Sequence, residues 1–260
     1  MRSPAARFPR SSGRRRAAHS SRERRRRSGA EPRARARAGR RRRAIRSERW
    51  RTGRGVVRVA HLSPDAPNVD VALGTRTVLS NVPFGAVSDY LVLDPGTRRI
   101  RISPSGAPEM PVFDSHVAFE NHAYTVAAVG EVAGRNQLFR VKRFVDDVEP
   151  PASDKASVTL IHAAPDAPEV DVTVEGADLT LFEGLGFGRA SGYETVPAGS
   201  YTLEVRPATP TNDGDVVATF DVTLEGGTVV TAYAVGYLSQ SGAPADEPFD
   251  LLSTVDSRAD

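Results

Sequence analysis

The chain of 260 residues carries 35 basic and 32 acidic residues and no cysteine, so its formal net charge is only +3. The absence of cysteine excludes disulfides, thiolate metal sites and a cysteine nucleophile. No apolar run reaches the roughly 18 residues that a membrane-spanning helix needs, so the sequence predicts no transmembrane segment.

The small net charge hides two oppositely charged segments. Residues 1–55 contain 22 arginines, no lysine and three glutamates, which gives +19, whereas residues 56–260 contain 13 basic and 29 acidic residues, which gives −16. The acidic part has only two lysines, Lys142 and Lys155. Such a surface is typical of salt-adapted proteins, because it stays hydrated when salt screens charge repulsion. An ordinary acidic protein from a GC-rich genome is the alternative.

Residues 1–55 are predicted to form a disordered, arginine-rich tail, because a segment of Arg, Ala, Ser, Gly and Pro cannot bury a core. Clustered arginines would bind nucleic acid by counterion release, so nucleic acid is a predicted partner only if this tail is genuine. The alternative is a mis-assigned start, since GC-rich DNA read in a wrong frame gives the same composition. No apolar segment follows the arginines, so no signal peptide is recognised.

From Val56 onward, apolar residues alternate with polar or small ones between turn sequences such as Asp94-Pro95-Gly96. The alternation is clearest in three places, at Val69, Val71 and Leu73, at Val170, Val172 and Val174, and from Val216 to Leu224. A period of two is the pattern of a strand with one buried face. Without any helical apolar stripe, the pattern predicts an all-β protein of antiparallel β-sandwich domains, immunoglobulin-like or transthyretin-like, after the tail.

One segment of the chain occurs twice, 101 residues apart. The residues from His61 to Val71 read HLSPDAPNVDV, and those from His162 to Val172 read HAAPDAPEVDV. This offset is about the length of one β-sandwich domain, so the repeat predicts two tandem domains. We place them at residues 56–144 and 157–240, with a proline-containing linker at 145–156 and a C-terminal extension at 241–260.

The similarity between the repeats continues beyond this segment. Phe84-Gly85 matches Phe187-Gly188, Tyr90 matches Tyr193, and the first repeat closes with Tyr-Thr-Val-Ala-Ala-Val-Gly at Tyr124 to Gly130. These motifs resemble the domain-of-unknown-function 4397 family, a haloarchaeal and bacterial envelope-type β domain, twice over about residues 56–240. The family has no established activity and often occurs in exported proteins. The resemblance therefore implies a fold and an extracellular or envelope location, with a cytoplasmic location as the alternative.

Each repeat contains one histidine and two aspartates in the same pattern, namely His61, Asp65, Asp70, His162, Asp166 and Asp171. They could form a cation site, since carboxylates bind hard cations and histidine favours transition metals. The alternative is structural: an aspartate in a proline-rich turn caps backbone N–H groups, and the histidine bonds the same turn. Alternation points Asp70 and Asp171 toward solvent or the outer face. We expect the structural role, and hence no catalytic residue, metal or cofactor.

These observations favour a non-catalytic, salt-adapted binding or structural module at the cell surface or outside the cell, with an unknown surface ligand or protein as its partner. One alternative is a metal-dependent enzyme that uses the repeated histidines and aspartates. The other is a nucleic-acid-associated protein that acts through its arginine-rich tail.

Overall fold

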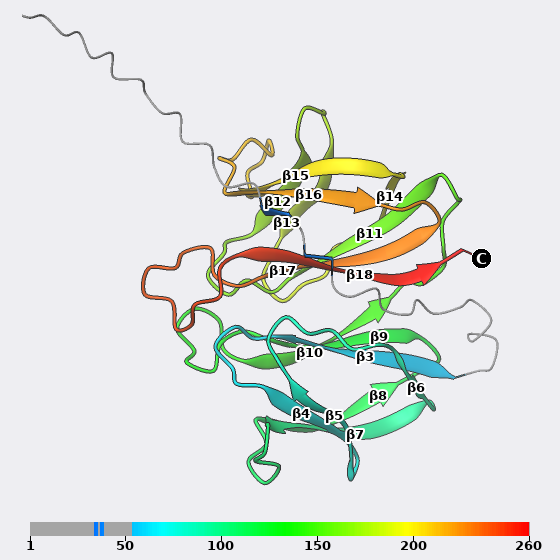
Figure 1. The fold of residues 1–260 in the computed structure, drawn as a ribbon, viewed down its shortest axis with the longest axis vertical. Helices are drawn as coiled ribbons and strands as arrows, with labels where there is room; N and C mark the ends of the chain where they lie inside the picture. The colour runs from blue at the N-terminus through cyan, green and yellow to red at the C-terminus, as the bar shows by residue number, and fades with distance from the viewer. Residues whose placement is uncertain (1–33, 36, 39–53, 260) are drawn as a thin grey trace, which may run out of the picture. The chain divides into compact units, whose positions relative to one another are not determined.

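The computed structural model describes residues 34–35, 37–38 and 54–259, and its ordered elements are β-strands (Figure 1). The first domain consists of β3 (Gly55–Leu62), β4 (Val69–Leu73), β5 (Arg76–Val82), β6 (Leu91–Leu93), β7 (Gly96–Pro104), β8 (Phe113–Phe119), β9 (Ala123–Val129) and β10 (Arg140–Asp146). The second consists of β11 (Lys155–His162), β12 (Val170–Val174), β13 (Thr180–Leu185), β14 (Glu194–Pro197), β15 (Gly199–Pro207), β16 (Ala218–Leu224), β17 (Thr228–Val235) and β18 (Asp250–Arg258). Within this part of the chain, no helix has the length and apolar character needed to cross a membrane.

Each domain is a sandwich of two sheets, and the domain supplies four strands to each of these sheets. The first domain has the strand orders β10-β9-β3-β6 and β5-β4-β7-β8, and the second repeats them as β18-β17-β11-β14 and β13-β12-β15-β16. The predicted tandem of β-sandwiches is confirmed. One pair in each domain, β3 with β9 and β11 with β17, runs parallel. The alternation of apolar and polar residues could not predict this parallel pairing, because it indicates which face of a strand is buried and not the direction of the strand. The chain between the two parallel strands passes through the facing sheet, which makes it long enough for the crossover that parallel pairing requires.

Two further strands, β1 (Ala34–Arg35) and β2 (Arg37–Ala38), lie beside β16 and β18. The described residues from Ala34 onward belong to one compact unit that includes both domains. The disorder predicted for residues 1–55 falls almost wholly outside the described residues. The exceptions are the four strand residues of β1 and β2, Arg54, and Gly55, which opens β3.

The second domain extends further than its predicted end at residue 240. The segment 241–260, predicted as a C-terminal extension, contains β18, which pairs along its length with β17. This strand matches β10 of the first domain, which pairs in the same way with β9. The prediction of an extension was therefore wrong, because the repeated motifs end one strand before the domain does. The connection between the domains is residues 147–154.

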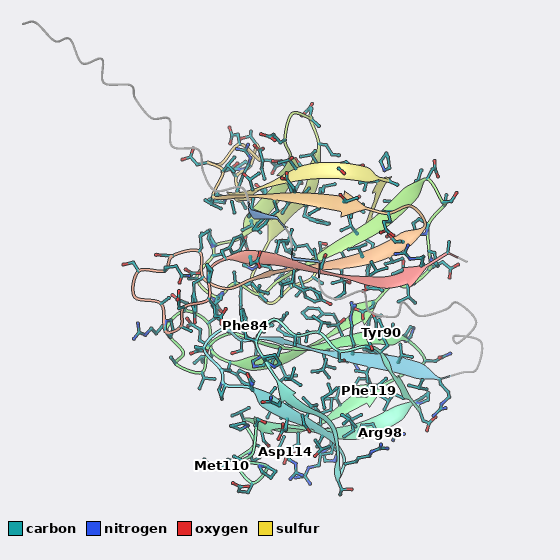
Figure 2. All side chains as sticks on the ribbon, viewed as in Figure 1. Phe84, Tyr90, Arg98, Met110, Asp114 and Phe119 are labelled. Atoms are coloured by element: carbon teal, nitrogen blue, oxygen red, sulfur yellow. The ribbon has the colours of Figure 1, made fainter. Side chains whose placement is uncertain are left out.

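The three largest apolar clusters form the cores of the two domains and the contact between them. One fills each sandwich, around Ile100 in the first domain and Phe220 in the second. The third lies between the domains and joins the sheets that contain β3 and β11. Figure 2 shows Phe84 and Tyr90 on the side of the first domain that faces the second, with Met110 on the opposite side. The strands β3 and β17 are buried along their whole length, because one face packs in the sandwich and the other packs between the domains.

Candidate functional site

The first aspartate of each repeated motif binds a distant loop of its own domain. Asp65 accepts the backbone N–H of Val132 on Oδ1 (2.8 Å) and that of Ala133 on Oδ2 (2.7 Å). Asp166 does the same with Leu238 and Ser239, each at 2.8 Å. Each carboxylate therefore ties the loop after the first strand of its domain to the loop that follows β9 or β17. The prediction that these aspartates accept backbone N–H bonds is confirmed, although the donors are about 70 residues away and not in the same turn.

The two histidines face their own proline-rich turns. Nε2 of His61 lies 3.1 Å from the carbonyl of Pro67, and Nε2 of His162 lies 2.9 Å from that of Pro168. A carbonyl only accepts, so this nitrogen carries the proton and donates. Nδ1 of each ring is buried without a hydrogen-bond partner. Burial lowers the pKa of both histidines, and the bond to the carbonyl raises it only in part. The rings are therefore neutral members of the core.

The second aspartate of each motif caps an irregularity in the neighbouring strand. Asp70 accepts the N–H of Asn81 (2.7 Å), and Asp171 accepts that of Gly184 (2.7 Å). Both donors have positive φ, 52° and 55°, at the bulges of β5 and β13. Asp171 lies on the face of β12 opposite the core residues Val170 and Val172, as alternation predicts, but it is only 1 % exposed because the loops whose backbone N–H groups it accepts cover it.

The Phe-Gly motif has a backbone role beside the histidines. The N–H of Gly85 donates to the carbonyl of His61, and the N–H of Gly188 donates to that of His162, both at 2.8 Å. Both glycines have positive φ, 76° and 71°, a conformation that a residue with Cβ rarely adopts. The motif thus closes the loop onto the histidine. Across the described residues, no three His, Cys, Asp or Glu side chains gather as a metal site would require.

We expect Asp65→Ala and Asp166→Ala each to lower the free energy of unfolding by about 0.5–2 kcal/mol, the range for losing a capping carboxylate. Asp65→Asn, which keeps one acceptor oxygen, should lose less. Denaturant unfolding with and without chelator, at fixed ionic strength, measures the effect. A chelator that lowers the melting temperature of the parent protein, but not of the variants, would instead identify a cation site.

A charged cluster is buried between the two domains. Arg58 on β3 is 2 % exposed. Its Nε donates to Thr125 Oγ1 (2.7 Å), Nη1 donates to Thr254 Oγ1 (2.8 Å) and Asp256 Oδ1, and Nη2 donates to Thr231 Oγ1 (3.0 Å) and Asp256 Oδ2 (3.1 Å). These five bonds match the five N–H donors of a guanidinium. Because three of the four partners belong to the second domain, Arg58 fixes the two domains to each other.

A second carboxylate faces the same guanidinium. Asp146 on β10 accepts hydrogen bonds from Tyr90 (2.7 Å) and Thr125, and its Oδ2 lies 3.6 Å from Nη2 of Arg58. Burial raises the pKa of Asp146; the charge of Arg58 opposes this rise, and that of Asp256 adds to it. Asp146 therefore binds a proton more readily than an ordinary aspartate does. The cluster thus links strands of both domains through buried, charge-assisted hydrogen bonds.

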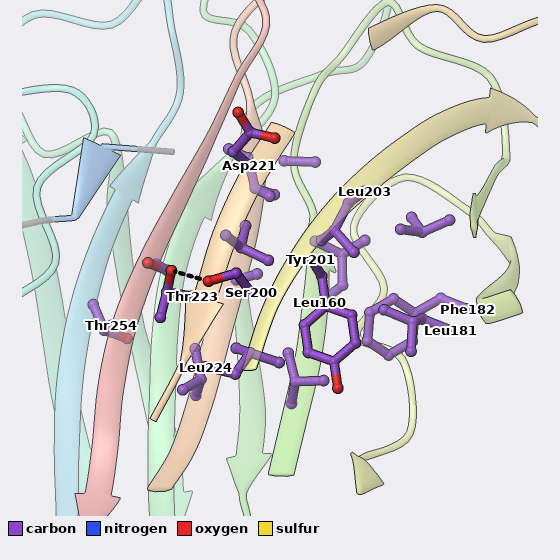
Figure 3. Close-up of a pocket in the computed structure, with 18 of the residues that line it drawn as sticks. Leu160, Leu181, Phe182, Ser200, Tyr201, Leu203, Asp221, Thr223, Leu224 and Thr254 are labelled. Carbon is purple, nitrogen blue, oxygen red and sulfur yellow. Dashed lines mark hydrogen bonds between the residues drawn. The ribbon is translucent and has the colours of Figure 1, made fainter. Parts of the chain in front are cut away.

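The second domain contains a cavity of about 830 Å³ between its two sheets (Figure 3). Apolar side chains from both sheets line it, among them Leu160, Phe182 and Val230. At its rim, Ser200 and Thr223 bond each other (3.1 Å), as Figure 3 shows, and Asp221 and Thr254 also contribute. An apolar wall with a polar rim, at this volume, is typical of a small-ligand or side-chain binding site.

Two substitutions between the repeats account for this cavity. The first domain has Tyr124 and Arg143 where the second, by strand register, has Val230 and Ser253. The guanidinium of Arg143 lies over the Tyr124 ring (5.1 Å) and donates to the carbonyl of Ala118 on β8. The Tyr124 side chain is buried in the first sandwich, and the exposed Arg143 covers it and links the edge strands β8 and β10. Valine and serine are too short to do either in the second.

The sequence had pointed to neither the charged cluster nor the cavity. Arg58 has no counterpart in the second repeat, where Thr159 is in its place. A comparison of β10 with β18 would have paired Asp146 with Asp256, but β18 was assigned to an extension. The signal for the cavity was the loss of two large side chains between otherwise similar repeats.

A protein-family model described as a domain of unknown function (DUF4397) matches residues 55–173 and again residues 156–259. No curated protein matches the chain. Among solved structures, a streptococcal virulence factor that binds α-glucan is 10 % identical, with a TM-score of 0.23, over 65 % of this chain and 88 % of its own. A leucine-rich repeat protein from Bacteroides thetaiotaomicron VPI-5482 is 14 % identical, with a TM-score of 0.19, over 80 % of this chain and 27 % of its own. Neither score supports a shared fold.

Proposed function

Since the chain belongs to the DUF4397 family, as a tandem of two such domains, we propose that it is a non-catalytic binding module of the cell surface or extracellular space. The ligand site in this proposal is the cavity of the second domain. The first domain has the supporting role, because its core contains Tyr124 where the second has Val230, and because Arg58 binds it to the second domain.

The cavity between the sheets carries this proposal. Its volume of about 830 Å³ lies at the upper part of the range for small-ligand pockets. A sandwich interior is normally packed to near-crystalline density, so space of this size is costly to keep unless something occupies it. The repeated aspartates offer no competing site, since their carboxylates accept backbone N–H groups of neighbouring loops.

We expect the parent protein to bind one molecule of the neutral apolar probe N-phenyl-1-naphthylamine per chain, with a rise in probe fluorescence. The variant Val230→Tyr/Ser253→Arg places the side chains of the first domain into the second, and should bind at least about tenfold more weakly, a loss of about 1.4 kcal/mol. It should also melt no lower than the parent, because it fills empty space.

The matched control is Ser253→Ala, which removes the hydroxyl without filling the cavity and should bind as the parent does. Equal probe binding by the parent and the filled variant would contradict a site in this cavity. A filled variant that melts several degrees lower would show that the space is needed for folding and would remove the comparison with the first domain.

The excess of 29 acidic over 13 basic residues in residues 56–260 supports salt adaptation as part of the proposal. We expect the melting temperature to rise between about 0.1 M and 1 M salt, because the Debye length shrinks from about 10 Å to 3 Å and self-repulsion falls. A melting temperature that stays constant over this range would remove salt adaptation from the proposal, and would leave the binding site untouched.

A further inference from the structure

The cavity of the second domain is long and follows the strand β17. Its lining includes every second residue along this strand, namely Thr228, Val230, Ala232 and Ala234. The six residue steps between the first and the last of them, at about 3.3 Å each, span about 20 Å. A volume of about 830 Å³ over that length leaves a cross-section of about 40 Å². These dimensions suit an extended chain better than a compact molecule.

The two ends of the cavity differ in polarity. At the end where β16 turns into β17, the polar lining residues are Ser200, Thr223, Glu225, Thr228 and Arg258. At the opposite end, where β17 finishes and β12 begins, the lining residues are Val170, Val205, Ala234 and Leu251. The first end therefore suits a polar group, and the second suits a hydrocarbon.

The cavity wall has no need of hydrogen bonds from a ligand. Among the described residues, the buried side-chain polar atoms without a partner belong to four residues outside the lining, namely His61, His162, Tyr237 and Ser257. The hydroxyl of Thr228 at the polar end donates to the carbonyl of Glu225 (2.6 Å). A sugar or a nucleotide between the apolar walls would lose its hydration and gain no hydrogen bonds in return. The interior thus favours a hydrocarbon chain.

The charges at the polar end balance each other. Glu225 and Arg258 form an ion pair, and their side chains are 53 % and 49 % exposed. A charged ligand group placed there would meet one residue of its own sign and would compete with it for the other. An uncharged polar group can instead accept a hydrogen bond from the guanidinium and donate one to the carboxylate. This end therefore favours a neutral head group.

We propose that the cavity binds a single-chain amphiphile with an uncharged polar head. The hydrocarbon chain lies along β17 with its tip at Ala234, and the head lies beside Glu225 and Arg258. This inference rests on the proposed function, because it names the ligand class of the same cavity.

The chain is tested with n-alkanols from hexanol to decanol, which displace N-phenyl-1-naphthylamine from the full-length protein. Affinity should rise about fourfold with each added methylene, as expected for burial of hydrocarbon. Ala234→Leu shortens the cavity at its apolar end, and should weaken decanol relative to hexanol at least about fourfold, the effect of one methylene. Val170→Ile adds a single methyl group at the same end and tests the same point with a smaller change.

The position of the head is tested with decanoate, which carries a carboxylate on a chain of the same length as decanol. Glu225→Gln removes the like charge and should raise the affinity for decanoate relative to decanol by about two- to fivefold, the range for half-exposed charge pairs. Arg258→Gln is the matched variant, and should lower the same ratio by a similar factor.

Affinities that do not depend on chain length would overturn the proposal, and so would equal losses of hexanol and decanol in Ala234→Leu or Val170→Ile. A decanoate-to-decanol ratio that does not change in either charge variant would overturn the position of the head. If N-phenyl-1-naphthylamine binds and no alkanol displaces it, the ligand class fails and the proposed function stands. If the probe itself does not bind, both fail.

Discussion

Replacement of Arg58 by methionine should lower the free energy of unfolding by about 3–5 kcal/mol, the cost of leaving a buried ion pair with one partner. The variant keeps most of the side-chain volume but removes five hydrogen bonds and the only cation between Asp146 and Asp256 among the described residues. Both carboxyl groups would then lie buried together without a counter-charge. Denaturant unfolding followed by circular dichroism measures the loss.

The pH dependence of this loss identifies its electrostatic origin. The pKa of Asp146 is raised in the folded protein above the ordinary aspartate value of 3.8, so above that pH the folded state binds more protons than the unfolded state, and stability falls as pH rises. Without Arg58 this pKa rises further. The deficit of Arg58→Met should therefore be larger at about pH 7 than at about pH 4.5. Adding Asp146→Asn and Asp256→Asn should recover at least half of it; a deficit independent of pH would point to lost packing instead.

The repeat predicted the architecture because it is a property of the whole chain. A motif that returns after one domain length, with period-two alternation around it, leaves few arrangements other than two sandwiches. The motif also predicted its own role, since Asp65 and Asp166 accept backbone N–H groups. The partners of these aspartates were beyond prediction, because they come from loops about 70 residues away that only the folded sheets bring close.

The interface and the cavity depend on residues that differ between the two repeats. A comparison that looks for repeated motifs does not detect such residues. Arg58 lies between Val57 and Val59, where alternation predicts a polar residue facing solvent. The structure instead covers that face with the second domain, so the arginine is buried. The same holds for β3 and β17, whose two apolar faces serve different cores. A single sequence does not distinguish a strand face that meets water from one that meets another domain.

The contact between the domains combines large side chains of one repeat with small ones of the other. Leu62 corresponds to Ala163, and Tyr233 corresponds to Ala127, and all four lie in the shared cluster. A third pair of this kind is Ala60 and Ile161. Two copies of the first domain would leave gaps at the alanines, and two copies of the second would crowd the tyrosine. The complementary sizes therefore favour pairing of unlike domains within one chain over pairing of like domains between chains.

Tyr233→Ala should consequently lower the free energy of unfolding by about 3–5 kcal/mol, as for other buried aromatic residues cut back to alanine. Tyr233 is 0 % exposed, packs in the cluster between the domains, and lies 5.9 Å from the guanidinium carbon of Arg58. Its loss should weaken both domains, because each uses this face to bury a central sheet. The parent should unfold in one transition, and the variant should unfold in two separate transitions.

Tyr233→Phe, which keeps the ring and loses only a 3.4 Å contact with Thr254, is the control and should lower the free energy of unfolding by less than about 1.5 kcal/mol. If Tyr233→Ala unfolds in one transition at the stability of the control, the two domains do not depend on this contact.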